Sequence, residues 1–384
     1  MTDLDALLRD AVARREAPFL VAMSGNSGGV TWSGAAGERA PGQDATVDTV
    51  FRIFSMTKAV GSTAAMILID RGKLGMDTEV ETVLPEFANV QVLEGIEGGK
   101  PLLRAPRRKA TVRHLATHTS GFVYEFWNSM MPSYMEVSGH PTIISGLNAS
   151  LNYPLVFDPG ERWDYGIGID WLGKVVETGD GRTVDRFCQD EIFGPLEMVD
   201  TGFEVEGSMG ERLANVKARG EDGNFIDFDL SPPSRPEFYG MGHALYSTAP
   251  DYMRFLRMFL NRGALDGHRI LSEDALDQML ANQIGDLRVG LMKTVAPPVT
   301  ADAEFFPGHE KTHSFGFMRM EEDVPGKRSK GSQAWAGVLN SHFWFDPHRD
   351  VAGLIMTQML PFADPAFIRA YERYEEGVYD NLPA

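Results

Sequence analysis

Strand-like segments at both ends of the chain, separated by a long region of helical patterns, constrain the fold more than any other feature. Residues 18–38 alternate apolar and polar side chains around a Gly/Ser/Asn turn, which is typical of a β-hairpin. Strand patterns return over residues 313–320, 333–347 and 350–359. Residues 76–245 instead show helical patterns and loops. This order predicts an α/β (α+β) fold, in which an antiparallel sheet flanked by helices is interrupted by an inserted all-α lobe.

The chain length supports a division into two parts. At 384 residues the chain exceeds the roughly 250 to 300 residues over which a single hydrophobic core grows, so we expect two cores. Residues 1–75 and 246–384 are predicted to form a discontinuous α/β domain and residues 76–245 a helical domain, with the functional site between them. Residues 56–72 are apolar on nearly every side, which predicts a buried helix.

Charge and cysteine content exclude several classes of partner. The formal net charge of −18 opposes binding to nucleic acid or to an anionic membrane surface, because both carry the same sign. The longest apolar stretch, residues 62–69, is far shorter than the ~20 residues that cross a bilayer, and residues 1–20 predict an amphipathic helix rather than an export signal. The single cysteine, Cys188, cannot form an internal disulfide, which favours a cytoplasmic location. We therefore expect neither nucleic acid nor a membrane as a partner, and the oligomeric state stays open.

Two literal motif matches stand in the wrong structural context. Residues 25–29, GNSGG, match the G-x-S-x-G nucleophile elbow, but a strand rather than a helix follows Ser27, so we interpret the segment as a hairpin turn. Residues 309–313, HEKTH, match the H-E-x-x-H zinc signature, which requires both histidines on one face of a stable helix. The flanking segments FFPG and SFGFM predict a loop that enters a strand. We therefore expect no catalytic serine in the hairpin turn and no metal site at His309 and His313.

A third match, Ser55 and Lys58 in the sequence SMTK, has a context that fits nucleophilic chemistry. Ser55 ends a strand-like run and begins the buried helix, so its hydroxyl can lie at the positive end of that helix. Lys58 follows one turn later on the same face. Burial disfavours the ammonium form, which would let the amine accept a proton from the serine near neutral pH. The alternative is a helix-capping serine beside a lysine whose ammonium group reaches solvent.

Six motifs together resemble those of the serine β-lactamase-like superfamily. They are SMTK at 55–58, LATHTSGF at 115–122, FDPGERWDYG at 157–166, GPLEMVDTGF at 194–203, ALYSTAPDYMRFL at 244–256 and WAGVLNSHFWFDP at 335–347. They occur in the order found in that family and span roughly residues 20 to 360. Within the superfamily, the chain most resembles the class C β-lactamase-like carboxylesterases, which are called family VIII esterases.

This resemblance implies roles for individual residues. Ser55 is similar to the nucleophile, Lys58 to its base and Tyr165 to the tyrosine that faces both. The backbone N–H groups of Ser55 and Val338 are implied to form the oxyanion hole. His118 is expected to be a structural histidine that is satisfied by backbone groups. The residues expected to contact substrate are Trp335, Ala336 and Gly337, which fall where β-lactamases carry K-T-G, and, in an adaptable apolar pocket, Tyr124, Phe126, Trp127, Met130, Met131, Tyr239 and Met241.

Two departures from the family pattern bear on the substrate. Ile167 replaces the asparagine of the Tyr-x-Asn motif, and Trp335 replaces the lysine that attracts the carboxylate of a β-lactam. Both changes make penicillins and cephalosporins poor preferred substrates. The resemblance therefore implies hydrolysis of short- to medium-chain carboxylic esters through an acyl-enzyme on Ser55, with no metal or organic cofactor and with weak β-lactamase activity at most. An acyltransferase or a D-amino-acid amidase/peptidase on the same scaffold is the alternative. The resemblance implies a small-molecule ester substrate as the partner.

Overall fold

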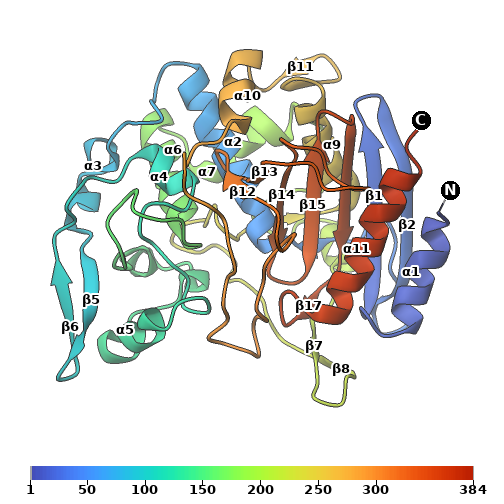
Figure 1. The fold of residues 1–384 in the computed structure, drawn as a ribbon, viewed down its shortest axis with the longest axis horizontal. Helices are drawn as coiled ribbons and strands as arrows, with labels where there is room; N and C mark the ends of the chain where they lie inside the picture. Colours follow the sequence, from blue (N-terminus) through green and yellow to red (C-terminus); the bar gives the residue numbers. More distant parts are fainter. Residues whose placement is uncertain (1, 384) are drawn as a thin grey trace.

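An antiparallel sheet of eight strands is the largest in the computed structural model, which describes residues 2–383 (Figure 1). The strands follow the order β12-β13-β14-β15-β16-β1-β2-β3, so the two ends of the chain meet where Val21 lies opposite Met356. Their bounds are β1 (Phe19–Asn26), β2 (Gly29–Ala40), β3 (Gln43–Asp44), β12 (Lys311–His313), β13 (Met318–Met320), β14 (Gln333–Gly337), β15 (Ser341–Asp346) and β16 (Val351–Met356). The predicted N-terminal hairpin and antiparallel sheet are confirmed.

Helices pack on both faces of this sheet and fill the region beside it. Their bounds are α1 (Leu4–Ala13), α2 (Thr57–Asp70), α3 (Val80–Val83), α4 (Val112–Ala116), α5 (Met130–Ser138), α6 (Gly168–Asp180), α7 (Val184–Cys188), α8 (Met209–Arg212), α9 (Ala249–Leu260), α10 (Glu273–Leu280) and α11 (Pro365–Asp380). In β15, Phe343 contacts Tyr252 of α9, whereas its neighbour Trp344 contacts Tyr374 of α11. Because successive side chains of a strand point to opposite faces, α9 and α11 cover opposite sides of the sheet. Within residues 2–383, no helix is both long and apolar enough to cross a bilayer.

The inserted lobe is not entirely helical. β5 (Val92–Glu97) and β6 (Lys100–Arg104) form an antiparallel hairpin whose turn contains Gly98 and Gly99, both at positive φ. This hairpin is short and largely exposed, so its sequence lacks the sustained alternation of a half-buried strand. The other short strands are β4 (Phe51–Arg52), β7 (Lys217–Arg219), β8 (Phe225–Asp227), β9 (Tyr246–Ser247), β10 (Ala264–Leu265), β11 (His268–Arg269) and β17 (Met359–Leu360).

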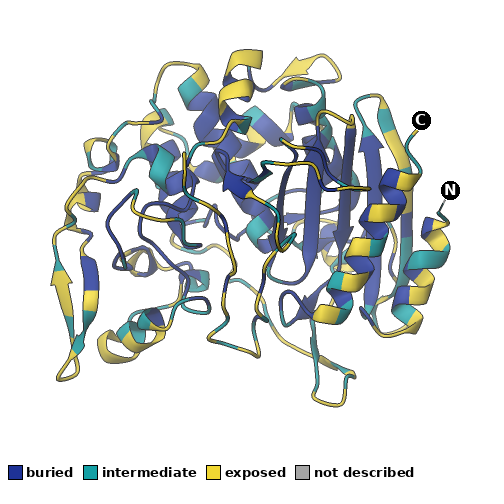
Figure 2. Cartoon of the chain, viewed as in Figure 1, coloured by how far each residue is buried: buried dark blue, intermediate teal, exposed yellow. Residues whose placement is uncertain are grey.

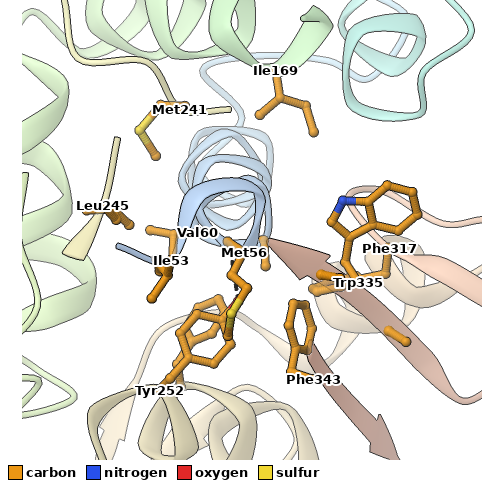
Figure 3. Close-up of a cluster of buried hydrophobic side chains, with 14 of the residues drawn as sticks. Ile53, Met56, Val60, Ile169, Met241, Leu245, Tyr252, Phe317, Trp335 and Phe343 are labelled. Atoms are coloured by element: carbon orange, nitrogen blue, oxygen red, sulfur yellow. Dashed lines mark hydrogen bonds between the residues drawn. The ribbon is translucent and has the colours of Figure 1, made fainter. Parts of the chain in front are cut away.

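Buried residues run through both the sheet and the inserted lobe (Figure 2), and the apolar ones form one main cluster. Leu20 in the sheet, Val60 in α2 and Leu172 in α6 all belong to it. The expectation of two separate cores is therefore wrong. The reason is α2, whose residues 57–68 are all buried and which packs against α6 on one side and against sheet residues such as Phe343 on the other (Figure 3). This central position confirms the predicted buried helix.

Candidate active site

Ser55 lies at a sharp turn between β4 and the buried helix α2. A single helical turn, η1 (Phe54–Met56), carries Ser55 directly into α2. Phe54 has a φ of 42°, in the left-handed region, where a non-glycine residue costs roughly 1–2 kcal/mol. Strained backbone of this kind persists only when surrounding contacts enforce it, and it is frequent at functional sites. The turn places the Ser55 hydroxyl at the N-terminal end of α2.

Lys58 is buried, and three oxygen atoms surround its amine. Its Nζ donates to Ser55 Oγ at 3.1 Å, to the Tyr124 hydroxyl at 2.9 Å and to the carbonyl oxygen of Gly242 at 2.7 Å. Burial lowers the pKa of Lys58 to about 7, and the negative charge of Asp170 acts in the opposite direction. An amine with this pKa is partly neutral at neutral pH, so it can accept the proton of Ser55.

Tyr165 completes the group around Ser55. Its hydroxyl accepts a hydrogen bond from Nε1 of Trp335 at 3.2 Å, and Nζ of Lys58 lies 5.0 Å from the centre of its ring. Burial raises the pKa of Tyr165, while hydrogen bonds with Ser55 and Trp335 act in the opposite direction. The phenol therefore stays protonated at neutral pH and can pass a proton between Ser55 and a leaving group. The buried His118 ring packs 4.8 Å from that of Tyr165, and burial lowers its pKa, so it lies there as a neutral ring.

Tyr124 is more central than the sequence predicts. We expect it only as a pocket residue, but its hydroxyl contacts the amine of Lys58, and its ring centre lies 5.0 Å from that of Tyr165. The backbone N–H of Tyr124 donates to the carbonyl of Tyr165 at 3.0 Å. Glycine at position 166 permits this approach, because a Cβ on Gly166 would lie 2.2 Å from the carbonyl oxygen of Phe122. No spacing rule reveals the Lys58–Tyr124 contact, which joins residues 66 positions apart.

Asp170 holds the backbone carbonyl that binds Lys58, and the sequence analysis does not identify it. Its carboxylate is fully buried, and Oδ1 accepts a hydrogen bond from the N–H of Gly242 at 2.9 Å. A Cβ at Gly240 or Gly242 would lie 2.6 or 2.4 Å from this carboxylate. The loop can therefore wrap around Asp170 only with glycine at both positions. The GMG sequence of this loop is the one local signal of its special geometry.

Strand β14 runs against the segment that precedes Ser55. A Cβ on Gly337 would lie 2.3 Å from the carbonyl oxygen of Ile53, so only glycine permits this approach. Val338 follows in the turn to β15 and lines the same cavity as Ser55. Ser55 and Val338 therefore line one cavity from two segments of the chain, and the oxyanion hole formed by their N–H groups stays a prediction.

Two cavities meet at Ser55. The larger has a volume of about 500 Å³ and is bounded mainly by apolar side chains. The predicted pocket residues that line it are Tyr124 and Phe126, accompanied by Phe54, Met135, Ile143, Ile144, Phe228, Leu230, Val295, Val299, Val338 and Leu360. The smaller has a volume of about 20 Å³ and is lined by Phe126, Trp127, Tyr165, Trp335, Ala336 and Val338, among others. Five of the ten residues expected to contact substrate thus line the cavities at the serine: Tyr124, Phe126, Trp127, Trp335 and Ala336.

Four expected pocket residues lie elsewhere. Tyr239 borders a separate pocket of about 670 Å³. Met241 is fully buried on the side of α2 away from Trp335 (Figure 3). Met130 and Met131 of α5 also lie outside the two cavities at the serine. The expectation for Tyr239 and Met241 is wrong because the glycine loop that contains Met241 turns inward around a buried carboxylate.

The GNSGG and HEKTH segments have the local structures that the sequence predicts, a hairpin turn and a loop that enters a strand. Ser27 lies in the turn between β1 and β2, and its hydroxyl donates to Asp350 at 2.7 Å. His309 lies in a loop, whereas His313 is buried at the end of β12. Across residues 2–383, no cluster of three or more His, Cys, Asp or Glu side chains could hold a metal ion.

Comparison with known proteins supports the resemblance seen in the motifs. The family described as Beta-lactamase matches residues 4–377. The monacolin J acid methylbutanoyltransferase of Aspergillus terreus is 28% identical over 98% of this chain and 95% of its own length. The lovastatin esterase of Penicillium rubens is 28% identical over 91% of this chain and 89% of its own length. A solved structure of a simvastatin synthase mutant from Aspergillus terreus has a TM-score of 0.84 at 27% identity and covers 99% of this chain and 94% of that one. The chain belongs to the Beta-lactamase family.

Proposed function

We propose that this protein is a serine carboxylesterase that hydrolyses short- to medium-chain esters through an acyl-enzyme on Ser55. The observation that carries the proposal is the 3.1 Å hydrogen bond between Nζ of Lys58 and Oγ of Ser55, at the junction of two cavities. A serine hydroxyl is a weak nucleophile until an adjacent base takes its proton. The lowered pKa of Lys58 suits that task.

The proposed reaction has two halves. Ser55 Oγ attacks the ester carbonyl carbon while Lys58 takes the hydroxyl proton, with Tyr165 sharing it. The carbonyl oxygen becomes negative and accepts hydrogen bonds from the N–H groups of Ser55 and Val338, each of which contributes about 2.7–4 kcal/mol. Collapse of this intermediate expels the alcohol, which receives the proton through Tyr165. Water then attacks the acyl-enzyme in the same way, releases the acid and restores the Ser55 hydroxyl.

The walls of the two cavities support a neutral, fairly apolar ester as substrate. Trp335 contacts Tyr165 at the position where β-lactamases carry a lysine, so the site lacks a cation there for a β-lactam carboxylate. We therefore propose weak β-lactamase activity at most. No cofactor enters either half of the reaction. The net charge of −18 disfavours nucleic acid and anionic membranes as partners, and the single cysteine supports a cytoplasmic location.

Acyl transfer to an alcohol is the second candidate function, and one of the relatives named above favours it. The monacolin J acid methylbutanoyltransferase, which supports transfer, is similar to this chain over nearly the whole of both. The lovastatin esterase, which is similar over most of both, supports hydrolysis instead. Hydrolysis and transfer share the acyl-enzyme and differ only in whether water or an alcohol attacks it. The cavity of about 500 Å³ is large enough for an alcohol acceptor of moderate size.

A fluorophosphonate probe followed by peptide mapping tests the nucleophile. We expect the adduct on Ser55, and an adduct on Ser27 or none at all would reject the proposal. Ser55→Ala should abolish hydrolysis of a short-chain nitrophenyl ester. The matched control Ser27→Ala should retain it, because Ser27 lies in an exposed turn.

A second alcohol in the same assay separates hydrolysis from transfer. The two products of one acyl donor, the free acid and the new ester, are measured as the concentration of the alcohol is raised. An esterase releases mainly acid at every alcohol concentration. A transferase yields mainly the new ester, and the total rate at which donor is consumed rises with the alcohol when deacylation limits turnover.

A further inference from the structure

The larger cavity at Ser55 is lined mainly by apolar side chains, and apart from Ser55 and Tyr124 its polar lining residues are Glu125 and His243. The Glu125 carboxylate accepts a hydrogen bond from the Tyr153 hydroxyl at 3.2 Å. Burial raises the pKa of Glu125, while its hydrogen bond with Tyr153 and the nearby His243 act in the opposite direction. We call Glu125 and His243 the polar corner. Neither belongs to the group of Ser55, Lys58 and Tyr165, so the proposed reaction leaves both without a role.

The orientation of His243 leaves one edge of its ring toward the cavity. Nδ1 lies 3.3 Å from Oδ1 of Asp170, and the side chain is only 7% exposed. A Cβ on Gly240 would lie 2.3 Å from Cε1 and 2.8 Å from Nδ1 of His243, so that edge of the ring is packed against the loop. The opposite edge carries Nε2. It is the edge that remains for a molecule in the cavity.

Polar groups at an otherwise apolar wall are costly unless they are hydrogen-bonded. The fully buried carboxylate of Asp170 lies behind the His243 ring, with Oδ1 3.3 Å from Nδ1. Glu125 is held in place by Tyr153. Two polar side chains that are positioned from behind and border a ligand-sized cavity have the form of a recognition site, in which a few placed polar groups orient a mainly apolar ligand.

We propose that the polar corner binds a neutral hydroxyl group on the substrate of the acyl-enzyme reaction proposed above. A hydroxyl can donate to the Glu125 carboxylate and can also exchange a hydrogen bond with Nε2 of His243. A carboxylate on the ligand would face Glu125 directly. The amine of Lys58 contacts Ser55 and Tyr124, which line the same cavity, so in its protonated form it disfavours an ammonium group on the ligand. The substrate class is therefore a hydroxylated ester with an otherwise apolar skeleton.

Matched pairs of esters test this proposal. In each pair, a hydroxyl group on one ester is replaced by a methyl group on the other, at successive positions along the chain. One series carries the change in the acyl part and the other in the alcohol part, so both ways of filling the cavity are covered. We expect kcat/KM to favour the hydroxylated member of at least one pair by about tenfold or more, because loss of a hydroxyl would leave buried polar groups unpaired.

Two conservative variants connect that preference to the polar corner. Glu125→Gln keeps the size of the side chain and removes its charge. His243→Asn keeps an N–H near Asp170 and removes Nε2. Each should reduce the preference at least threefold. The control Val299→Ala, on an apolar wall of the same cavity, should change both members of a pair in the same proportion.

A binding measurement keeps this test independent of catalysis. Calorimetry with Ser55→Ala and the same ester pairs should show tighter binding of the hydroxylated member, and Glu125→Gln added to that variant should remove the difference. The polar-corner proposal is wrong if the two esters of every pair have equal kcat/KM and equal affinity. It is also wrong if the preference for the hydroxylated ester remains in both Glu125→Gln and His243→Asn. If no fluorophosphonate adduct forms on Ser55, the proposed function is wrong. The calorimetry still tests whether the polar corner binds a hydroxyl group.

Discussion

At the scale of single residues, the chemistry of the site depends on the amine of Lys58. As an ammonium group it can donate to Ser55, Tyr124 and the carbonyl of Gly242 at once. The neutral amine has two hydrogens and one lone pair, and the carbonyl can only accept. The lone pair must therefore face one of the two hydroxyl groups. Deprotonation thus converts Lys58 from a donor into a base for Ser55.

The first prediction concerns the pH dependence of ester hydrolysis. Because burial lowers the pKa of Lys58 to about 7 and the neutral amine is the active form, kcat/KM should rise with pH through a midpoint near 7. Below the midpoint the ammonium form cannot take the serine proton. Initial rates with a nitrophenyl ester from about pH 5 to about pH 9 measure this midpoint, and the rate of fluorophosphonate labelling should share it. A rate that does not change with pH across this range would contradict the role of Lys58.

The second prediction separates the two tyrosines that contact the site. Tyr165→Phe should lower kcat by about 10² to 10⁴, because it removes the group that passes the proton to the leaving alcohol. Tyr124→Phe removes an oxygen that accepts from the ammonium form of Lys58, so the midpoint of the pH profile should move to lower pH. The comparison uses kcat and kcat/KM of both variants, measured as a function of pH. An unchanged midpoint in Tyr124→Phe would show that its hydroxyl does not influence Lys58.

At the scale of secondary-structure elements, the site depends on the close approach of β14 to the turn before α2. The turn carries Ser55, α2 carries Lys58 and the strand leads to Val338, so in the proposed reaction the distance between strand and turn sets the space for the carbonyl oxygen. At Gly337 the strand approaches the residue before that turn so closely that a Cβ would lie 2.3 Å from the carbonyl oxygen of Ile53. The geometry of an oxyanion hole tolerates little displacement, because its donors must stay within hydrogen-bond distance of the oxygen.

The third prediction tests this approach. In Gly337→Ala the new Cβ would lie 2.3 Å from the carbonyl oxygen of Ile53, so β14 must move away. We expect kcat to fall by about 10² to 10³ and the free energy of unfolding to fall by about 1–3 kcal/mol. Gly95→Ala in β5 is the matched control, because a Cβ there meets nothing within 4 Å and should leave kcat unchanged. Equal kinetics in the two variants would argue against a catalytic role for this spacing.

At the scale of the whole molecule, the ends of the chain close the structure around the sheet. β1 pairs with β16, and α11 packs on the face of the sheet opposite α9. A fully buried ion pair ties α11 to the loop before β14, with Nε of Arg328 2.7 Å from Oε1 of Glu375 and both side chains 1% exposed. Removing one partner of such a pair leaves the other partner's charge buried without a counter-charge.

The fourth prediction follows from that ion pair. Glu375→Ala should lower the free energy of unfolding by about 3–5 kcal/mol, measured by urea denaturation, because Arg328 would remain charged and buried. The exposed pair of Arg262 and Asp277 offers the control, since Asp277→Ala should cost less than about 1 kcal/mol. The kcat of correctly folded Glu375→Ala should stay close to that of the parent protein, because Glu375 lies outside the cavities at Ser55.

The sequence by itself determined the features that depend on neighbours along the chain. Alternation specified the N-terminal hairpin, the apolar run specified the buried helix α2, and the spacing of Ser55 and Lys58 placed both on one helical turn. The ordered motifs also led to the family that the comparison found. These features are readable because strand and helix periodicity act over a few residues.

Only the tertiary structure decided which distant groups surround the amine of Lys58. Tyr124 and Gly242 lie 66 and 184 positions from Lys58 along the chain. No motif or periodicity in the sequence indicates that they contact its amine. The same holds for Asp170, whose buried carboxylate draws the glycine loop inward and thereby removes Met241 from the pocket. Contacts of this kind arise from packing of whole elements against each other, and no short-range periodicity encodes them.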